Sequence, residues 1–228
     1  MWVLRGLRKG ILTTGYPGKG LAPDEVPRSS FPPTPSADAD WAKGGGLCPT
    51  GAIQGERVDA GRCVYCRRCK DAGFRFEGPA PGPMASERAA LARRVLGRSL
   101  HVLVLDVGSC NGCNMEVLNL ANPYYDFNRL GIFFTNTPKH ADVLLAVGAL
   151  NKAMVETLKR TYESMPEPKF VVAAGACAMS GGVFKDTDGF ASPLGDAVPV
   201  DVEIPGCPPT PLQLLDGLLL IGGRRRAP

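Results

Sequence analysis

The sequence predicts an α/β fold in which a doubly wound parallel sheet follows a smaller, cysteine-rich N-terminal module. From His101 onward, short apolar runs alternate with helical stretches, which is the pattern of parallel strands joined by crossover helices. Runs such as Val-Leu-Leu-Ala-Val hold no polar residue, as a sheet covered on both faces requires. Expected strands cover 102–107, 132–134, 143–147, 170–174 and 200–204, and expected helices cover 86–97, 153–165 and 211–220.

The chain divides into five expected segments. Residues 1–40 form a Pro/Gly-rich arm that should be extended and lack a core of its own. Residues 41–78 form the cysteine-rich module, which is too small to bury much apolar surface and should depend on a metal site for folding. A linker and helix (79–99), the α/β domain (100–222) and a basic tail (223–228) complete the chain.

Composition narrows the class of protein. The 228 residues are 44% apolar and 21% charged, as in an ordinary globular protein. The formal net charge is only +4 and is spread out, so nucleic acid is not an expected partner. The apolar stretch 212–221 is shorter than the ~20 residues that a membrane helix needs. We therefore expect a soluble or peripheral protein.

The eight cysteines are not expected to form disulfides. No secretory signal is recognisable, C-x2-C spacing recurs, and every cysteine falls into one of two sets of four. A reducing, cytoplasmic setting follows. Each set is a candidate metal site.

The first set follows half of a two-cluster ferredoxin pattern and consists of Cys48, Cys63, Cys66 and Cys69. Such ferredoxins carry two C-x2-C-x2-C-x3-C-P runs, and the last cysteine of each run ligates the other cluster. The positions that would hold the other cluster are occupied by Asp38, Trp41, Gly44 and Gly73. One cluster has lost all its ligands and the other keeps all of them, so this set predicts one 4Fe-4S cluster. Structural zinc is the alternative.

The second set comes from three loops that follow the first, fourth and last expected strands: Cys110, Cys113, Cys177 and Cys207. The carboxyl ends of parallel strands meet at one edge of the sheet, so these loops should lie together. Four thiolates at one point need a metal. Spacing alone leaves both an iron-sulfur cluster and structural zinc open.

Four motifs, at 108–116, 138–145, 175–182 and 204–211, resemble the small subunit of membrane-bound, energy-converting nickel-iron hydrogenases, including the formate hydrogenlyase type. They also resemble its relative in respiratory complex I, which carries the last cluster before quinone. The resemblance implies a flavodoxin-like sheet, and a proximal 4Fe-4S cluster held by the second set. The C-x2-C spacing of Cys110 favours the hydrogenase branch, because the complex I relative has adjacent cysteines there.

Two further features are interpreted through this resemblance. Residues 7–17 look like the start of the two-cluster ferredoxin subunit of the same complexes, which implies a fusion of two subunits with one cluster lost. Glu116 has a counterpart in both branches, and it is either a proton relay or large-subunit contact, or simply an acid in the first turn of a helix.

The function expected from the resemblance is an electron-transfer subunit with two 4Fe-4S clusters, serving a nickel-iron centre in a partner large subunit. Other implied partners are further iron-sulfur subunits and membrane-embedded subunits, which would hold the chain at the inner face of the cell membrane. One alternative is a quinone oxidoreductase of the complex I type, or a nickel-free relative. An alternative of another class is a metal-stapled scaffold without a redox role.

Overall fold

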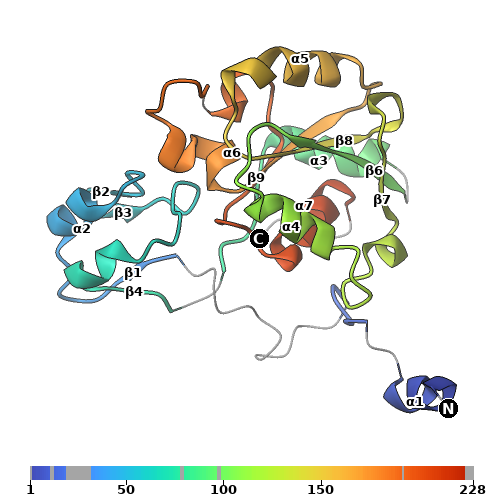
Figure 1. Cartoon of the computed structure of the whole chain (residues 1–228), viewed down its shortest axis with the longest axis horizontal. Coiled ribbons are helices and arrows are strands. Elements are labelled where there is room, and N and C mark those ends of the chain that lie inside the picture. The colour runs from blue at the N-terminus through green and yellow to red at the C-terminus, as the bar shows by residue number, and fades with distance from the viewer. Residues whose placement is uncertain are drawn as a thin grey trace.

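The structure is a computed structural model that describes residues 2–10, 13–18, 32–77, 80–96, 99–191 and 193–223. The predicted basic tail beyond Gly223, and Gly97 at the predicted end of the first helix, lie outside these residues. Figure 1 shows a larger α/β body with a smaller module at its side. None of the described helices combines the length and apolar character needed to span a bilayer.

A six-stranded sheet forms the centre of the larger body, in the order β5-β10-β9-β8-β6-β7. The strands are β5 (Met84–Ala85), β6 (Leu100–Asp106), β7 (Ile132–Phe134), β8 (Val143–Val147), β9 (Phe170–Ala174) and β10 (Val202–Ile204). All neighbours are parallel except β5 and β10. From β6 along the chain, the parallel strands lie in the order 2-1-3-4-5 of flavodoxin-like sheets. The predicted fold class is confirmed.

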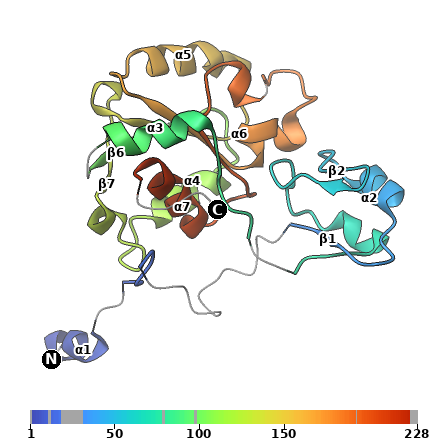
Figure 2. The same cartoon turned by 180° about the vertical axis from the view of Figure 1, so that it is seen from behind.

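Helices cover both faces of this sheet, as Figures 1 and 2 show from opposite sides. They are α3 (Glu87–Val95), α4 (Gly112–Asn119), α5 (Val155–Glu163), α6 (Ala176–Ser180) and α7 (Pro211–Ile221). Alternate residues of β8 enter two different cores. Val143 and Leu145 pack with residues of α3, α4 and α7, whereas Leu144 packs with residues of α5 and α6. The apolar runs of the sequence are continuous because each strand must supply both cores.

The predicted strands 132–134, 143–147 and 170–174 coincide with β7, β8 and β9. Strand β6 begins two residues earlier than predicted, and β10 two residues later. The predicted helix 153–165 consists of a 3-10 turn, η4 (Lys152–Met154), followed by α5. Strand β5 was not predicted, because it has two residues and depends on pairing with β10. Further 3-10 turns are η2 (Phe127–Leu130), η3 (Pro138–His140), η5 (Gly182–Phe184) and η6 (Leu194–Asp196).

The N-terminal arm differs from the extended segment that the sequence predicted, because it begins with helix α1 (Trp2–Lys9). This stretch holds none of the arm's prolines, and its leucines, arginines and lysine are good helix formers. Farther along, the arm is fastened to the larger body. The amide of Thr14 donates to the carbonyl of Tyr124 at 2.8 Å, and Arg129 Nη2 donates to the carbonyls of Thr14 and Tyr16 at 2.7 Å each.

The smaller module is made of short elements around a small apolar core. They are β1 (Thr34–Pro35), α2 (Trp41–Leu47), β2 (Ile53–Gln54), β3 (Arg57–Val58), η1 (Arg68–Ala72) and β4 (Phe74–Arg75). Two antiparallel pairs, β1 with β4 and β2 with β3, tie the chain together. Asp40 caps α2 by accepting a hydrogen bond from the amide of Lys43 at 2.9 Å. Ile53 and Phe74 form the centre of the core, with Trp41 packed against it.

Candidate metal centres

The second cysteine set lies in the loops at the carboxyl edge of the sheet. Cys110 and Cys113 follow β6 at the start of α4, and Cys177 lies in α6, directly after β9. Cys207 follows β10 and precedes α7. The doubly wound topology thus brings together three loops that are far apart in sequence.

The thiols of this set are close enough to oppose one another's ionisation. Burial, followed by the charges of Cys177, Cys207 and Cys110, raises the pKa of Cys113 to about 12. Burial, followed by the charges of Cys207 and Cys110, raises the pKa of Cys177 to about 11. Metal ligation requires thiolates, so a cationic group among these sulfurs would supply the charge that favours their ionised form.

Glycines allow backbone to pass directly beside two of these sulfurs. A Cβ on Gly175 would lie 2.8 Å from the Sγ of Cys113, and a Cβ on Gly182 would lie 2.9 Å from the Sγ of Cys177. Both glycines also have positive φ, at 93° and 55°. A side chain at either position would therefore push into the space around the thiols. The cradle fits a group that needs close backbone approach.

The loop that carries Cys110 is held by Asp106, a residue that sequence reasoning did not single out. Its Oδ1 accepts from the amides of Gly108 at 2.9 Å and Ser109 at 2.7 Å, and its Oδ2 accepts from the Ser109 hydroxyl at 2.8 Å. Asn114 Nδ2 also donates to Oδ2. Burial raises the pKa of Asp106, but these hydrogen bonds outweigh it and leave the pKa below its ordinary value.

The first cysteine set lines one cavity of the module. Cys48 follows α2, Cys63 and Cys66 lie between β3 and η1, and Cys69 lies in η1. All four side chains line the same small cavity, together with Thr50 and Ile53. Burial is the largest cause that raises the pKa of Cys63 to about 12; a hydrogen bond from the Tyr65 backbone lowers it, and the charges of Cys48, Cys69 and Cys66 raise it. The structure brings these four predicted residues together as well.

Cys48 differs from Cys63 because amide and hydroxyl groups surround its sulfur. The amide of Ala52 donates to Cys48 Sγ at 3.2 Å, and the Thr50 hydroxyl lies 3.7 Å from the same sulfur. Burial raises the pKa of Cys48, but hydrogen bonds from Thr50 and Ala52 bring it below its ordinary value. Hydrogen bonds of this kind stabilise a thiolate and tune a metal group bound to it.

Apolar packing occupies the positions where the ferredoxin pattern places the other cluster. The rings of Trp41 and Phe74 meet edge to face with centroids 5.2 Å apart. A Cβ on Gly44 would lie 2.6 Å from the Phe74 ring, and one on Gly73 would lie 3.1 Å from the Cα of Ala39. Three of the four replaced positions therefore take part in close contacts of the module.

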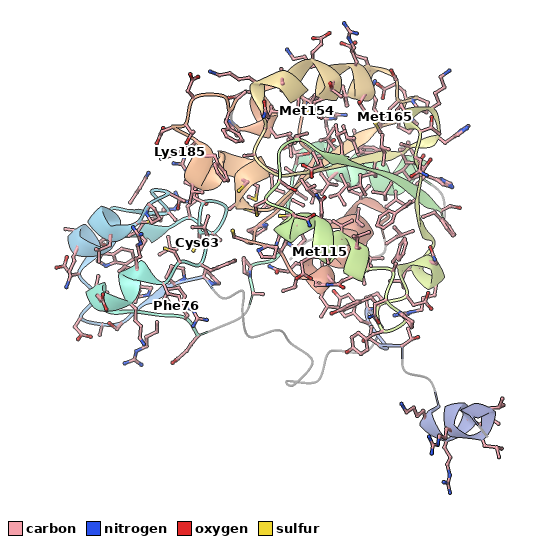
Figure 3. All side chains as sticks on the ribbon, in the orientation of Figure 1. Cys63, Phe76, Met115, Met154, Met165 and Lys185 are labelled. Carbon is pink, nitrogen blue, oxygen red and sulfur yellow. The ribbon has the colours of Figure 1, made fainter. Side chains whose placement is uncertain are left out.

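The module and the larger body meet at a junction beside one cysteine of each set, Cys63 and Cys177. The Ser180 hydroxyl oxygen lies 3.4 Å from the carbonyl oxygen of Gly61, and a Cβ on Gly61 would lie 2.6 Å from the methyl carbon of Met179. Figure 3 labels Cys63 on the side of the module that is turned toward the larger body. The loop that carries Cys63 thus packs on α6, the helix that carries Cys177.

Glu116 lies on α4, one turn after Cys113, and is exposed over part of its surface. Its Oε2 accepts from Asn119 Nδ2 at 3.3 Å, and its charge, after burial, raises the pKa of Tyr125. A role in proton transfer stays a prediction.

Over the part of the chain that the structure describes, no three Cys, His, Asp or Glu side chains meet as ligands of a single metal ion.

Fold and site together define a class of protein: a flavodoxin-like α/β chain with thiol-bearing loops at the carboxyl edge of its sheet and a second thiol set in an attached module. Comparison with known proteins gives the family. The family described as "NADH ubiquinone oxidoreductase, 20 Kd subunit" matches residues 110–221.

Three curated relatives agree with that match. The chain is 41% identical over 141 residues to the "Probable membrane-bound hydrogenase subunit mbhJ" of Pyrococcus furiosus, covering 59% of this chain and 84% of the relative. It is 41% identical over 140 residues to formate hydrogenlyase subunit 7 of Escherichia coli, covering 61% and 54%. It is 49% identical over 107 residues to a subunit of the NADH-quinone oxidoreductase of Citrifermentans bemidjiense, covering 47% and 62%.

The chain belongs to the 20 kDa subunit family of NADH ubiquinone oxidoreductase, whose named relatives are subunits of oxidoreductase complexes. The resemblance to hydrogenase and complex I subunits that the sequence suggested is confirmed. The family match begins at Cys110, so the smaller module lies outside it. The module's function must be argued from its own residues.

Proposed function

We propose that this chain is an electron-transfer subunit holding two 4Fe-4S clusters, which relays electrons to or from a nickel-iron centre in a partner large subunit. The observation that carries the proposal is the grouping of all eight cysteines into two four-thiol sets on either side of one junction. Membership in a family of oxidoreductase subunits supports the redox function over a metal-stapled scaffold.

Each set would hold one cluster. Cys110, Cys113, Cys177 and Cys207 would hold the proximal cluster, and Cys48, Cys63, Cys66 and Cys69 would hold the module cluster. A 4Fe-4S cluster, when bound, supplies a one-electron redox couple. The glycine cradle keeps side chains away from two sulfurs of the second set, and the four thiols of the first set line one cavity.

The residues of the chain have three tasks in this function. Loops on rigid strands hold the thiolates at fixed positions, with Asp106 fastening the loop of Cys110. Burial around Cys63 and Cys113 keeps water away from the sulfurs. The Ala52 amide donates to the Cys48 sulfur, and such donors raise the reduction potential of a ligated group.

The hydrogenase partner is favoured over a quinone site by the C-x2-C spacing of Cys110 and Cys113, and by the two relatives named as hydrogenase or hydrogenlyase subunits. The identity to the NADH-quinone oxidoreductase relative keeps a complex I-like quinone oxidoreductase, or a nickel-free relative, as the second candidate. In either assembly the chain would lie peripherally at the inner face of the cell membrane, held by further iron-sulfur and membrane-embedded subunits. Glu116 would face the partner or relay protons there.

Metal analysis of the anaerobically purified complex tests this function. We expect about eight iron and eight sulfide per copy of this chain from its two clusters, and EPR signals of two reduced clusters that interact magnetically. Zinc in place of iron would support the scaffold and contradict electron transfer. Nickel in the complex, together with hydrogen uptake using a viologen acceptor, would distinguish the hydrogenase from the quinone oxidoreductase.

A further inference from the structure

Tyr65 occupies the junction between the two cysteine sets. It lies between Cys63 and Cys66 in the sequence, yet the charge of Cys207, from the opposite set, acts on its side chain together with that of Cys63. Coulomb interactions fall off with distance, so the phenol lies within range of the charges of both sets.

The hydroxyl of Tyr65 is buried and has no hydrogen-bond partner among the described residues. A buried hydroxyl left without a partner is destabilising, so native proteins rarely leave one without a reason. At neutral pH a phenol carries its proton and can donate it to an acceptor. The cysteines on either side of Tyr65 in the sequence, Cys63 and Cys66, belong to the first thiol set, and ligated sulfur accepts hydrogen bonds.

The backbone holds Tyr65 in an uncommon conformation to achieve this placement. Its φ is 52°, in the left-handed region that side chains with a Cβ rarely adopt. The neighbouring loop is pinned to α6 through Gly61, Met179 and Ser180. Strain of this kind persists only where surrounding structure enforces it, and it concentrates at functional positions.

We propose that Tyr65 is a cofactor-contacting residue of the junction: its hydroxyl donates a hydrogen bond to sulfur of a bound cluster and raises that cluster's reduction potential. This inference rests on the proposed function. A donor to cluster sulfur stabilises the reduced, more negative state, so removing it lowers the potential. The residue would thereby set how easily an electron moves across the junction between the two sets.

The substitution Tyr65→Phe tests the proposal because it removes only the hydroxyl. The full chain, purified anaerobically with its clusters, is titrated electrochemically while the EPR signals of both clusters are recorded. We expect the midpoint of at least one cluster to fall by an amount equal to about a tenfold change in its reduction equilibrium, ~59 mV for one electron. Proton ENDOR should also lose one exchangeable coupling in Y65F. The midpoint potential does not depend on the fraction of chains that hold a cluster, so partial loss of iron cannot hide a shift.

Tyr162→Phe is the matched control. Its ring lies on α5 beneath Lys169, whose Nζ is 4.4 Å from the ring centroid, and it packs against the core that contains Leu144 and Leu158. Unchanged midpoints and couplings in Y65F, or an equal shift in Y162F, would overturn the role of Tyr65. If the wild-type chain holds two clusters but Y65F leaves their midpoint potentials and proton couplings unchanged, only this inference fails. Zinc in place of iron in the wild-type chain would overturn the proposed function itself.

Discussion

The sulfur of Cys113 lies only 2.8 Å from the point where a Cβ on Gly175 would stand. These two residues come from loops after different strands, β6 and β9, and meet at the carboxyl edge of the sheet. The glycine thus sets how closely the chain can wrap the second cysteine set. Its φ of 93° excludes a side chain on backbone grounds as well.

Replacing this glycine should disable one site selectively. We expect Gly175→Ala to displace Cys113 and reduce iron from about eight to about four per chain, with the module cluster retained. Gly195→Ala is the control, because a Cβ there would meet nothing within 4 Å. Full iron content in the Gly175 variant would contradict a cluster at this edge of the sheet.

The carboxylate of Asp106 should contribute to the order of the loop that carries Cys110. Asp106→Asn replaces a charged acceptor of four hydrogen bonds, and we expect a loss of about 1 kcal/mol or less, because the side chain is exposed. The folded pKa of Asp106 is lowered, so its stabilisation is complete above the ordinary value of 3.8 and is lost as pH falls through the folded value. Urea unfolding of both proteins between pH 3 and pH 7 measures this, and an unchanged pH dependence in the variant would refute it.

Raised thiol pKa values predict alkaline sensitivity of the metal-free protein. The folded pKa of Cys113, about 12, and that of Cys177, about 11, exceed the ordinary value of 9.0. The resulting stability is therefore complete below pH 9 and is lost as pH rises toward the folded values. Thermal unfolding of the metal-free chain, followed by circular dichroism, should show a midpoint that falls above pH 9. Replacing both cysteines by alanine should flatten that fall; an equally steep decline would point to other groups.

Packing of Trp41 on Phe74 should carry much of the module's stability. We expect Phe74→Ala to cost about 3–5 kcal/mol, because the ring is buried and its loss leaves a cavity. Hydrogen exchange of amides in α2 and η1 measures the loss within the module. Phe133→Ala, at a ring that is 40% exposed on β7, should leave these amides protected. Equal protection in both variants would mean that the aromatic pair is not the module's core.

Substitutions in the two cysteine sets should affect the activity of the assembled complex differently. We expect Cys110→Ser or Cys207→Ala to abolish hydrogen-linked turnover, since both would remove ligands of the cluster nearest the partner's active site. Cys66→Ser should spare turnover with an artificial viologen donor that bypasses the module. Wild-type turnover in the first two variants would contradict the proximal assignment.

Much of the fold could be predicted because the apolar pattern of the sequence agrees with the burial that each strand has in the folded sheet. The run Val143–Val147 is apolar throughout since both faces of β8 are covered, and its bounds follow from composition alone. Helix α1 and strand β5 were missed for opposite reasons. The helix lies in a segment dominated elsewhere by proline, and the strand exists only through pairing with β10.

In the candidate sites, too, features carried by the local sequence were predicted and features that depend on distant neighbours were not. The cysteine spacing predicted both sets, and the topology rule predicted that Cys207 would lie near Cys110. Asp106 and Tyr65 were missed, because their significance comes from neighbours. An aspartate before Val-Gly-Ser could have been recognised as an Asx turn that holds the loop, but nothing in the sequence relates Tyr65 to Cys207.

The module sits between two fastenings on the same body: Thr14 and Tyr16 are held by Arg129 before it, and β5 joins the sheet after it. Because the module and the larger body are parts of one polypeptide, the two thiol sets meet intramolecularly and dilution cannot separate them. Under the proposed function, the two halves of the relay would therefore be present in equal number, without an assembly step to match them.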